Sequence, residues 1–198
     1  MVESTENNLK PPPLRIGGLT IDRPTVLAPM AGLTDLPFRL LCARLGWGLV
    51  MTEVVNSQGV LRASSQTMWY LEAGAQERPV GAQLYGSDPQ VMAEAAARIE
   101  ALGRFDLIDI NCGCWVSNVA LRGAGAGLLR DLPRMREVVA RVCSATHLPV
   151  TVKTRLGWDA KSIRIVDVAR MLEDIGVKAL ALHCRTRAQG HKGNVDYR

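Results

Sequence analysis

The stretch "DLIDINCGCWVSNVALRGAGAG", residues 106–127, begins as an apolar strand, breaks into two cysteines around a glycine, and continues as a glycine-rich loop. Its first six residues are dense in apolar side chains, as in a strand that is covered on both faces of a parallel sheet. Asn111 ends this strand with a polar side chain. The stretch therefore predicts a buried parallel strand whose carboxyl end opens onto a functional site.

Similar apolar runs recur along the chain and alternate with segments of helical periodicity, which indicates repeated βα units. The repeat is about 31 residues, which suits a (β/α)8 barrel of roughly 250 residues. The six predicted strands begin at Thr25, Gly48, Pro79, Asp106, Pro149 and Lys178. The sequence thus predicts an α/β fold of the TIM (β/α)8-barrel type with about six of its eight βα units. Residues 194–198 are predicted to begin the sixth connecting helix.

The strand ends favour a barrel over an open doubly wound sheet. A doubly wound sheet concentrates its ligand contacts at one switch point, whereas a barrel gathers many strand ends around one site. Nearly every predicted strand finishes in a polar or ionisable side chain. These ends are Met30 with Ala31, Glu53, Gln83, Asn111, Lys153 with Arg155, and His183 with Arg185.

Apolar stripes predict which helix faces pack on the sheet. Met135, Val138, Val139 and Val142 form one stripe, and Leu41, Cys42 and Leu45 form a shorter one before Gly46. Asp88 followed by Pro89 predicts a capped helix start. Near the N-terminus, "LRIGGLTIDRP" predicts a small hairpin.

Composition places the chain among soluble globular proteins. Its 198 residues are 47% hydrophobic and 22% charged. No run approaches the roughly 18 apolar residues of a membrane helix. We expect residues 1–13 to be a disordered lead and the protein to be cytoplasmic. Five widely spaced cysteines predict free thiols, and a net charge of +5 suits a polyanionic partner.

The loop after the fourth strand holds the residues best suited to chemistry. Gly113 allows a sharp turn or a close approach to a ligand, and the exposed Cys114 can act as a nucleophile or proton donor. Cys112 is interpreted as a small packing residue. Zinc ligation by Cys112, Cys114, His183 and Cys184 is disfavoured because the C-x-C and H-C spacings are atypical, and we predict no metal.

Basic residues at neighbouring strand ends predict an anionic ligand. Lys153 lies in an apolar strand, and Arg155, His183 and Arg185 accompany it. Gln83 and Asn111 offer donors and acceptors that suit the edge of a heteroaromatic ring. These residue types together predict a flat ligand with a polar edge and a negative tail.

Five motifs in order closely resemble the tRNA-dihydrouridine synthases from about Ile16 to the last residue. They are "LAPMAGLTDLPFRLLCARLGWGLVMTEVV", "GAQLYGSDPQVMAEAA", "IDINCGCWVSNVALRGAGAGLLRD", "PVTVKTRLGWD" and "HCRTRAQGHKG". The resemblance implies a flavin barrel that reduces uridine in tRNA to dihydrouridine with FMN and NADPH. No membrane partner is expected, because the sequence has no apolar run long enough to span a membrane.

The family's functional residues transfer to matching positions of this chain. The resemblance implies that FMN is contacted by Pro29, Met30, Ala31, Gln83, Lys153 and His183. It places Asn111 beside the reacting uracil and makes Cys114 the catalytic proton donor, and we assign Arg185 to the substrate. In the implied reaction, one uracil carbon receives hydride and Cys114 protonates its neighbour.

The chain differs from the family pattern in three respects. Trp115 stands where the family commonly has proline, and it is expected to pack in the core or to stack on a base. Cys184 occupies a position expected to be small. Two strands and the family's C-terminal helical RNA-binding domain are missing, so we expect 14–198 to be a partial FMN-binding barrel domain with edges open to self-association.

Two other functions remain compatible with the sequence. The chain resembles flavin barrels closely enough that another FMN oxidoreductase acting on a small substrate is an alternative. An inactive truncated remnant that binds RNA is the other. The sequence does not indicate which uridine of the tRNA is modified.

Overall fold

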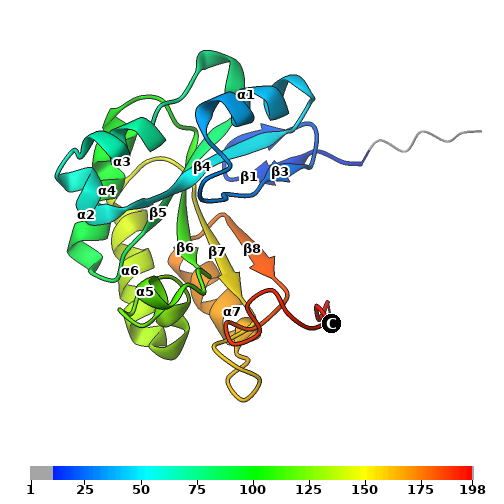
Figure 1. Ribbon diagram of the computed structural model, residues 1–198, viewed down its shortest axis with the longest axis vertical. Coiled ribbons are helices and arrows are strands. Elements are labelled where there is room, and N and C mark those ends of the chain that lie inside the picture. Colours follow the sequence, from blue (N-terminus) through cyan, green and yellow to red (C-terminus); the bar gives the residue numbers. More distant parts are fainter. Residues whose placement is uncertain (1–10, 198) are drawn as a thin grey trace, which may run out of the picture.

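A curled parallel sheet with helices on its outer side forms the body of the protein (Figure 1). The computed structural model describes residues 11–197. Residues 1–10 of the predicted lead lie outside the described part, and residues 11–13 are exposed without regular structure. The sheet has six strands in the order β3-β4-β5-β6-β7-β8, so each strand lies beside the next one along the chain.

All six predicted runs form strands and helices follow the first five of them, which confirms the α/β class. The strands are β3 (Val26–Leu27), β4 (Leu49–Asn56), β5 (Val80–Tyr85), β6 (Leu107–Cys112), β7 (Val150–Arg155) and β8 (Ala179–His183). Every neighbouring pair is parallel. Within residues 11–197, β3 and β8 are the outer strands, so the sheet forms an open half-barrel.

The predicted hairpin is confirmed and packs against one end of the half-barrel. Strand β1 (Leu14–Ile16) pairs antiparallel with β2 (Leu19–Ile21). Ile16 and Ile21 are buried against Leu49, Met51 and Leu107 of the sheet. Burial of these side chains removes apolar surface from water and fixes the hairpin on the sheet.

The helices cover the convex face of the sheet (Figure 1). They are α1 (Leu36–Arg44), α2 (Ser57–Leu61), α3 (Ser65–Tyr70), α4 (Pro89–Ala101), α5 (Ser117–Ala120), α6 (Leu132–Ala145) and α7 (Ile165–Ile175), with 3-10 turns η1 (Ala75–Glu77) and η2 (Gly125–Arg130). Asp35, Asp88 and Asp131 cap α1, α4 and α6, each with proline in the first turn. The cap predicted at Asp88 is confirmed, because its carboxylate accepts a hydrogen bond from the Val91 amide at 3.0 Å.

The predicted stripe on α6 is confirmed, whereas the stripe on α1 is wrong. Met135, Val138, Val139 and Val142 are fully buried. On α1, Leu41 and Leu45 are 52% and 71% exposed, and the buried residues are Cys42 and Arg39. The helix is therefore rotated so that a guanidinium takes the place expected for leucine.

Arg39 can be buried because its donors find fixed acceptors. Nε donates to Glu77 Oε2 at 2.8 Å, Nη1 to the Thr34 carbonyl at 2.8 Å, and Nη2 to the Glu72 carbonyl at 2.6 Å. Both charged side chains are almost fully buried. The loop after β3 is thereby fastened to η1, since Thr34 is hydrogen-bonded in turn to the backbone of Met30.

The end of the described chain corrects the predicted sixth helix. Residues 194–197 have no helical structure. The chain turns after β8 through Gly190 and Gly193, both at positive φ, and the Asp196 amide donates to the Cys184 carbonyl at 2.9 Å. Backbone at positive φ interrupts a right-handed helix. Among residues 11–197, no helix is long and apolar enough to span a bilayer.

We expect the Arg39–Glu77 pair to be essential to the fold. Arg39→Met leaves the Glu77 carboxylate buried without its partner, which should lower the free energy of unfolding by about 3–5 kcal/mol. Urea denaturation followed by circular dichroism measures the change. The matched control is Arg44→Met, because Arg44 lies on the same helix and is exposed. Equal stability of the two variants would contradict the role given to the pair.

Candidate active site

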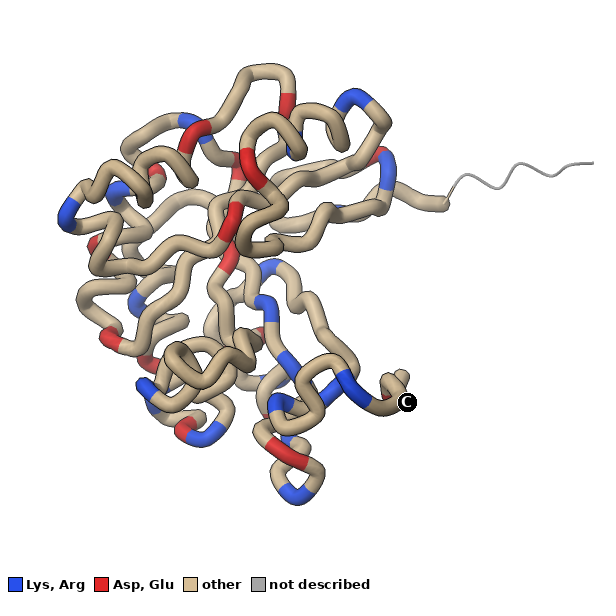
Figure 2. Tube along the Cα trace, viewed as in Figure 1, with Lys and Arg blue, Asp and Glu red and all other residues tan. Residues whose placement is uncertain are grey.

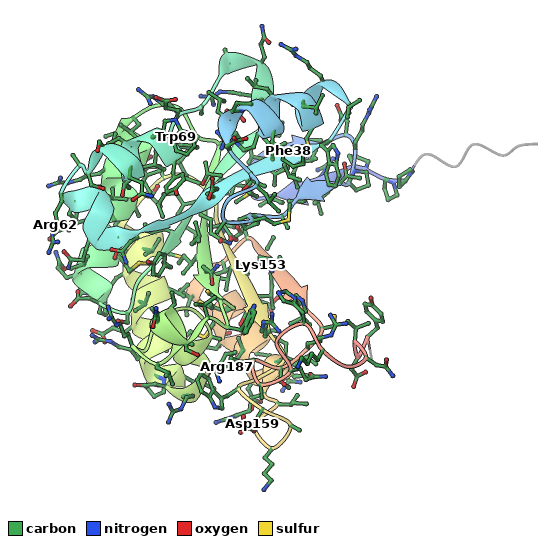
Figure 3. The ribbon with its side chains drawn as sticks, in the orientation of Figure 1. Phe38, Arg62, Trp69, Lys153, Asp159 and Arg187 are labelled. Carbon is green, nitrogen blue, oxygen red and sulfur yellow. The ribbon has the colours of Figure 1, made fainter. Side chains whose placement is uncertain are left out.

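The carboxyl ends of the strands and the loops that follow them line a cavity of about 440 Å³. The predicted site residues that line it are Pro29, Met30, Ala31, Gln83, Asn111, Cys114, Lys153 and His183. Figure 3 shows Lys153 on the inner side of the curled sheet. Arg185 is not among the lining residues, because its guanidinium folds over the following loop and donates to the Gly193 carbonyl at 3.0 and 3.1 Å.

The loop that carries Cys114 is held by the side chain of Asn111. Asn111 Oδ1 accepts hydrogen bonds from the amides of Gly113, at 3.1 Å, and Cys114, at 2.8 Å. An asparagine that bonds to backbone amides two and three residues ahead fixes a tight turn. Asn111 therefore sets the position of the cysteine backbone as well as lining the cavity.

Two glycines let other chain segments approach this loop closely. A Cβ added to Gly113 would lie 3.2 Å from the Thr154 backbone. Gly125 has φ +56°, and its added Cβ would lie 2.9 Å from Cys114 Cβ. The Cys114 carbonyl also accepts from the Ala126 amide at 3.0 Å. The glycine-rich loop thus packs directly against the cysteine.

Arg155 braces two loops of the site. Its Nε donates to the Gly113 carbonyl at 3.1 Å. Its Nη1 donates to the carbonyls of Thr186, at 3.0 Å, and Gly190, at 2.8 Å. The residue is buried. Sequence reasoning assigned Arg155 only to a ligand anion, and its contribution to loop structure was missed because its partners are distant in the chain.

Positive charge gathers on β7 and on the loop after β8 (Figure 2). Burial lowers the pKa of His183, and the charges of Arg155 and Lys153 lower it further. Burial also lowers the pKa of Lys153, while the Asp109 carboxylate acts in the opposite direction. His183 Nδ1 is buried and has no hydrogen-bond partner within the described chain. An anionic ligand would stabilise this group of side chains.

A buried carboxylate that sequence reasoning missed lies beneath the cavity. Asp109 Oδ2 accepts from Gln83 Nε2 at 2.6 Å, and Oδ1 accepts from Thr151 Oγ1 at 2.5 Å. Gln83 Oε1 in turn accepts from Asn111 Nδ2 at 2.9 Å. The acidic residue within the apolar run "DLIDIN" was the available signal, because a charged group in a buried strand needs a partner.

Glu53 was predicted at the central site, but it lies behind the cavity and supports the loop after β3. Its side chain is buried, and Oε2 accepts from the Gly32 amide at 2.5 Å. The register of β4 against β5 shifts between Met51 and Val54. Thr52 Oγ1 accepts the Gln83 amide at 3.1 Å in this irregular region.

Trp115 lies at the cavity wall, which corrects the expectation of core packing. Its side chain is 40% exposed, and its ring meets the His191 ring edge-on at a centroid distance of 5.4 Å. Trp115 therefore connects the cysteine loop to the loop after β8. An exposed indole at this place leaves base stacking open as a use.

The cysteines differ sharply in their surroundings. All five are free thiols, as predicted. Cys112 is fully buried in the core, as expected of a packing residue, and burial raises the pKa of its thiol. Cys114 is only partly buried and lines the cavity. No three His, Cys, Asp or Glu side chains of residues 11–197 are grouped as metal ligands.

The arrangement suits a flat heteroaromatic ligand with an anionic tail. Pro29 and Met30 offer apolar contact, Gln83 and Asn111 offer polar edges, Lys153 offers positive charge, and His183 offers an unpartnered ring nitrogen. Few polar groups on an otherwise apolar wall are typical of cofactor sites. A neighbouring cavity of about 290 Å³ shares Pro29 and Lys153 and is otherwise lined mainly by apolar side chains.

Comparison with known proteins assigns the chain to one group. The family model described as "Dihydrouridine synthase (Dus)" matches residues 26–198. The protein is 43% identical over 184 residues to "tRNA-dihydrouridine synthase B" of Pseudomonas aeruginosa, covering 93% of this chain and 55% of the relative. It is 40% identical over 186 residues to the protein of the same name from Vibrio cholerae, covering 93% of this chain and 57% of the relative.

A third relative comes from outside these bacteria. The chain is 41% identical over 186 residues to "Probable tRNA-dihydrouridine synthase 1" of Synechocystis, covering 92% of this chain and 51% of the relative. The chain thus spans about half the length of the curated relatives it matches.

We expect iodoacetamide to alkylate Cys114 faster than Cys112 in the native protein. Because Cys112 is fully buried and its thiolate is disfavoured, it should react at least about tenfold more slowly than Cys114. Tandem mass spectrometry of the peptide that contains both residues measures the two rates. A Cys114→Ala control should leave the slow rate of Cys112 unchanged, and similar rates for the two thiols would contradict the placement of Cys112 in the core.

Proposed function

The chain belongs to the dihydrouridine synthase family, and from this membership we propose that it carries the catalytic site of an oxidoreductase that converts uridine in tRNA to dihydrouridine. The observation that carries the proposal is the meeting of Cys114, Asn111, Gln83, Lys153 and His183 around one cavity. Residues 14–198 are proposed as part of an FMN-binding barrel domain. Action on tRNA also favours a cytoplasmic location.

The residues present fit FMN as the cofactor. Pro29, Met30 and Ala31 would lie against the isoalloxazine ring, and Gln83 would meet its polar edge. Lys153 would provide positive charge for an anionic cofactor, and His183 would provide its free Nδ1 as a hydrogen-bonding group. When bound, FMN supplies hydride to the uracil double bond, with NADPH proposed as the source of electrons.

The protein's own part in the reaction is orientation and proton transfer. Asn111 has both lone pairs of Oδ1 engaged by the amides of Gly113 and Cys114. One Nδ2 hydrogen is engaged by Gln83, which leaves the second to meet a uracil carbonyl. The Cys114 thiol would then give its proton to the uracil carbon next to the one that receives hydride. The close packing of Gly125 keeps this thiol in place.

A pair of arginines beside Trp158 supports tRNA as the partner. The guanidinium groups of Arg130 and Arg187 lie 4.9 and 4.4 Å from the Trp158 ring centroid. The indole face attracts each cation, and the pair concentrates positive charge that a polyanion can neutralise. Arg185 remains proposed for the substrate, from its position in the loop after β8 rather than from the cavity wall. Such groups gain affinity by releasing counterions from an RNA backbone.

Loss of the Lys153 charge should weaken flavin binding. In Lys153→Met we expect the dissociation constant for FMN to rise by about tenfold to a hundredfold, the effect of a lost charged hydrogen bond. Flavin fluorescence quenching measures it. Lys161→Met is the matched control because Lys161 is an exposed lysine of the loop after β7. Equal affinities of the two variants would argue against Lys153 as a cofactor ligand.

Removal of the Cys114 thiol should slow the reduction of tRNA. With FMN, NADPH and unmodified tRNA, Cys114→Ala is expected to reduce the rate of dihydrouridine formation by about 10²–10⁴-fold, because proton donation is lost. Nucleoside mass spectrometry gives the rate. Cys143→Ala, a partly buried cysteine on α6, serves as the control.

Three outcomes would overturn the proposal. A Cys114→Ala variant that reduces tRNA at the control rate would remove the thiol from the chemistry. Turnover of orotate or an enone by the protein, without turnover of tRNA, would establish the alternative of a flavin oxidoreductase for small substrates. Binding of tRNA without turnover and without FMN uptake would identify an inactive RNA-binding protein.

A further inference from the structure

Asp109 is a buried charged group that the proposed reaction does not use. It lies on β6 in one cross-strand row with Gln83 of β5 and Thr151 of β7. Its exposed fraction is 4%, and it lines the neighbouring cavity of about 290 Å³ rather than the cavity that contains Cys114. Burial raises the pKa of Asp109, while the hydrogen bonds from Gln83 and Thr151 and the charge of Lys153 favour the carboxylate. A carboxylate kept in such a place requires a structural reason.

The carboxylate determines which way the Gln83 amide faces. Both Asp109 oxygens accept hydrogen bonds, at 2.6 Å from Gln83 Nε2 and at 2.5 Å from Thr151 Oγ1. An ionised carboxylate has no hydrogen to donate. In the structure Gln83 turns its NH₂ group toward Asp109 and its Oε1 toward Asn111, and the reverse orientation would place two acceptor oxygens against each other wherever Asp109 is a carboxylate.

The orientation of Gln83 then determines that of Asn111. Gln83 Oε1 faces Asn111 and accepts from its Nδ2 at 2.9 Å. With Nδ2 committed to this bond, Asn111 Oδ1 faces the opposite side and accepts the Cys114 amide at 2.8 Å. Each side-chain amide has one donor end and one acceptor end. The orientation of Gln83 at Asp109 therefore determines the orientation of Asn111 at the cysteine loop.

We propose that Asp109 is a positioning residue, which fixes the orientation of the Gln83 and Asn111 amides and through them the backbone of Cys114. We call the chain of hydrogen bonds from Asp109 through Gln83 and Asn111 to the Cys114 amide the amide relay. Its use in catalysis rests on the proposed function, because the relay orients two proposed ligand contacts and the proposed proton donor. Its existence depends on the geometry alone.

Amide hydrogen exchange at Gly113 and Cys114 tests the relay without cofactor or RNA. In Asp109→Leu the carboxylate is lost and Gln83 can turn, so exchange at both amides should accelerate by about tenfold. Asp109→Asn should keep the wild-type exchange, because its Oδ1 can accept from Gln83 and its Nδ2 can donate to the Thr151 hydroxyl. If Asp109→Asn keeps the wild-type exchange rate, the relay depends on a hydrogen-bond acceptor at residue 109 and not on its negative charge.

Two controls separate the relay from general loss of structure. Thr151→Val removes the other hydrogen bond of Asp109 and should leave Gly113 and Cys114 protected, whereas Asn111→Ala removes their acceptor and should expose both. The thermal unfolding midpoint of each variant is measured alongside. If Asp109→Leu fails to fold, Gln83→Leu interrupts the relay one step closer to Asn111 and should give the same tenfold acceleration.

The proposal is overturned by either of two results. The first is wild-type protection of the Cys114 amide in folded Asp109→Leu or, where that variant does not fold, in Gln83→Leu. The second is accelerated exchange in Asp109→Asn equal to that of Asp109→Leu. The wild-type protein could show the expected exchange rates and still fail to reduce tRNA. That outcome would support the relay and would count against the proposed function alone.

Discussion

The parallel register of β5, β6 and β7 is the constraint on which the site depends. It aligns Gln83 with Asp109 and Asp109 with Thr151 in one row across three strands. Residues two positions further along β6 and β7, Asn111 and Lys153, form the next row on the same face. A slip of one residue would turn all of these side chains to the helix-covered face. Burial of the apolar positions between them prevents that slip.

Charge inside this fold is used in two different ways. Arg39 and Glu77 neutralise each other and have their hydrogen bonds supplied by fixed groups, which makes them a structural pair. At the cavity, Lys153, Arg155 and His183 lie near one another, and Asp109 is the carboxylate whose charge acts on Lys153. Basic side chains therefore outnumber carboxylates around the cavity, which gives it a positive potential that favours an anion.

Much of the fold was predictable because it depends on local patterns. The six strands and the residues at their carboxyl ends follow from apolar runs and from the geometry of βα units. Asp109 and Arg39 were not predicted, since each gains its partners from far along the chain. Thr151 is 42 residues and Gln83 is 26 residues from Asp109, and Glu77 is 38 residues from Arg39. No local pattern marks which buried charge will find a partner.

Arg155 joins the cysteine loop to the loop after β8 through the carbonyls of Gly113, Thr186 and Gly190. Two segments from separate βα units are thereby ordered as one surface before any ligand arrives. The conformational entropy of these loops is lost when the protein folds, so little more need be lost when a ligand binds. A motion of either loop must also be carried to the other, so the part of the cavity wall that these two loops form moves as a single unit.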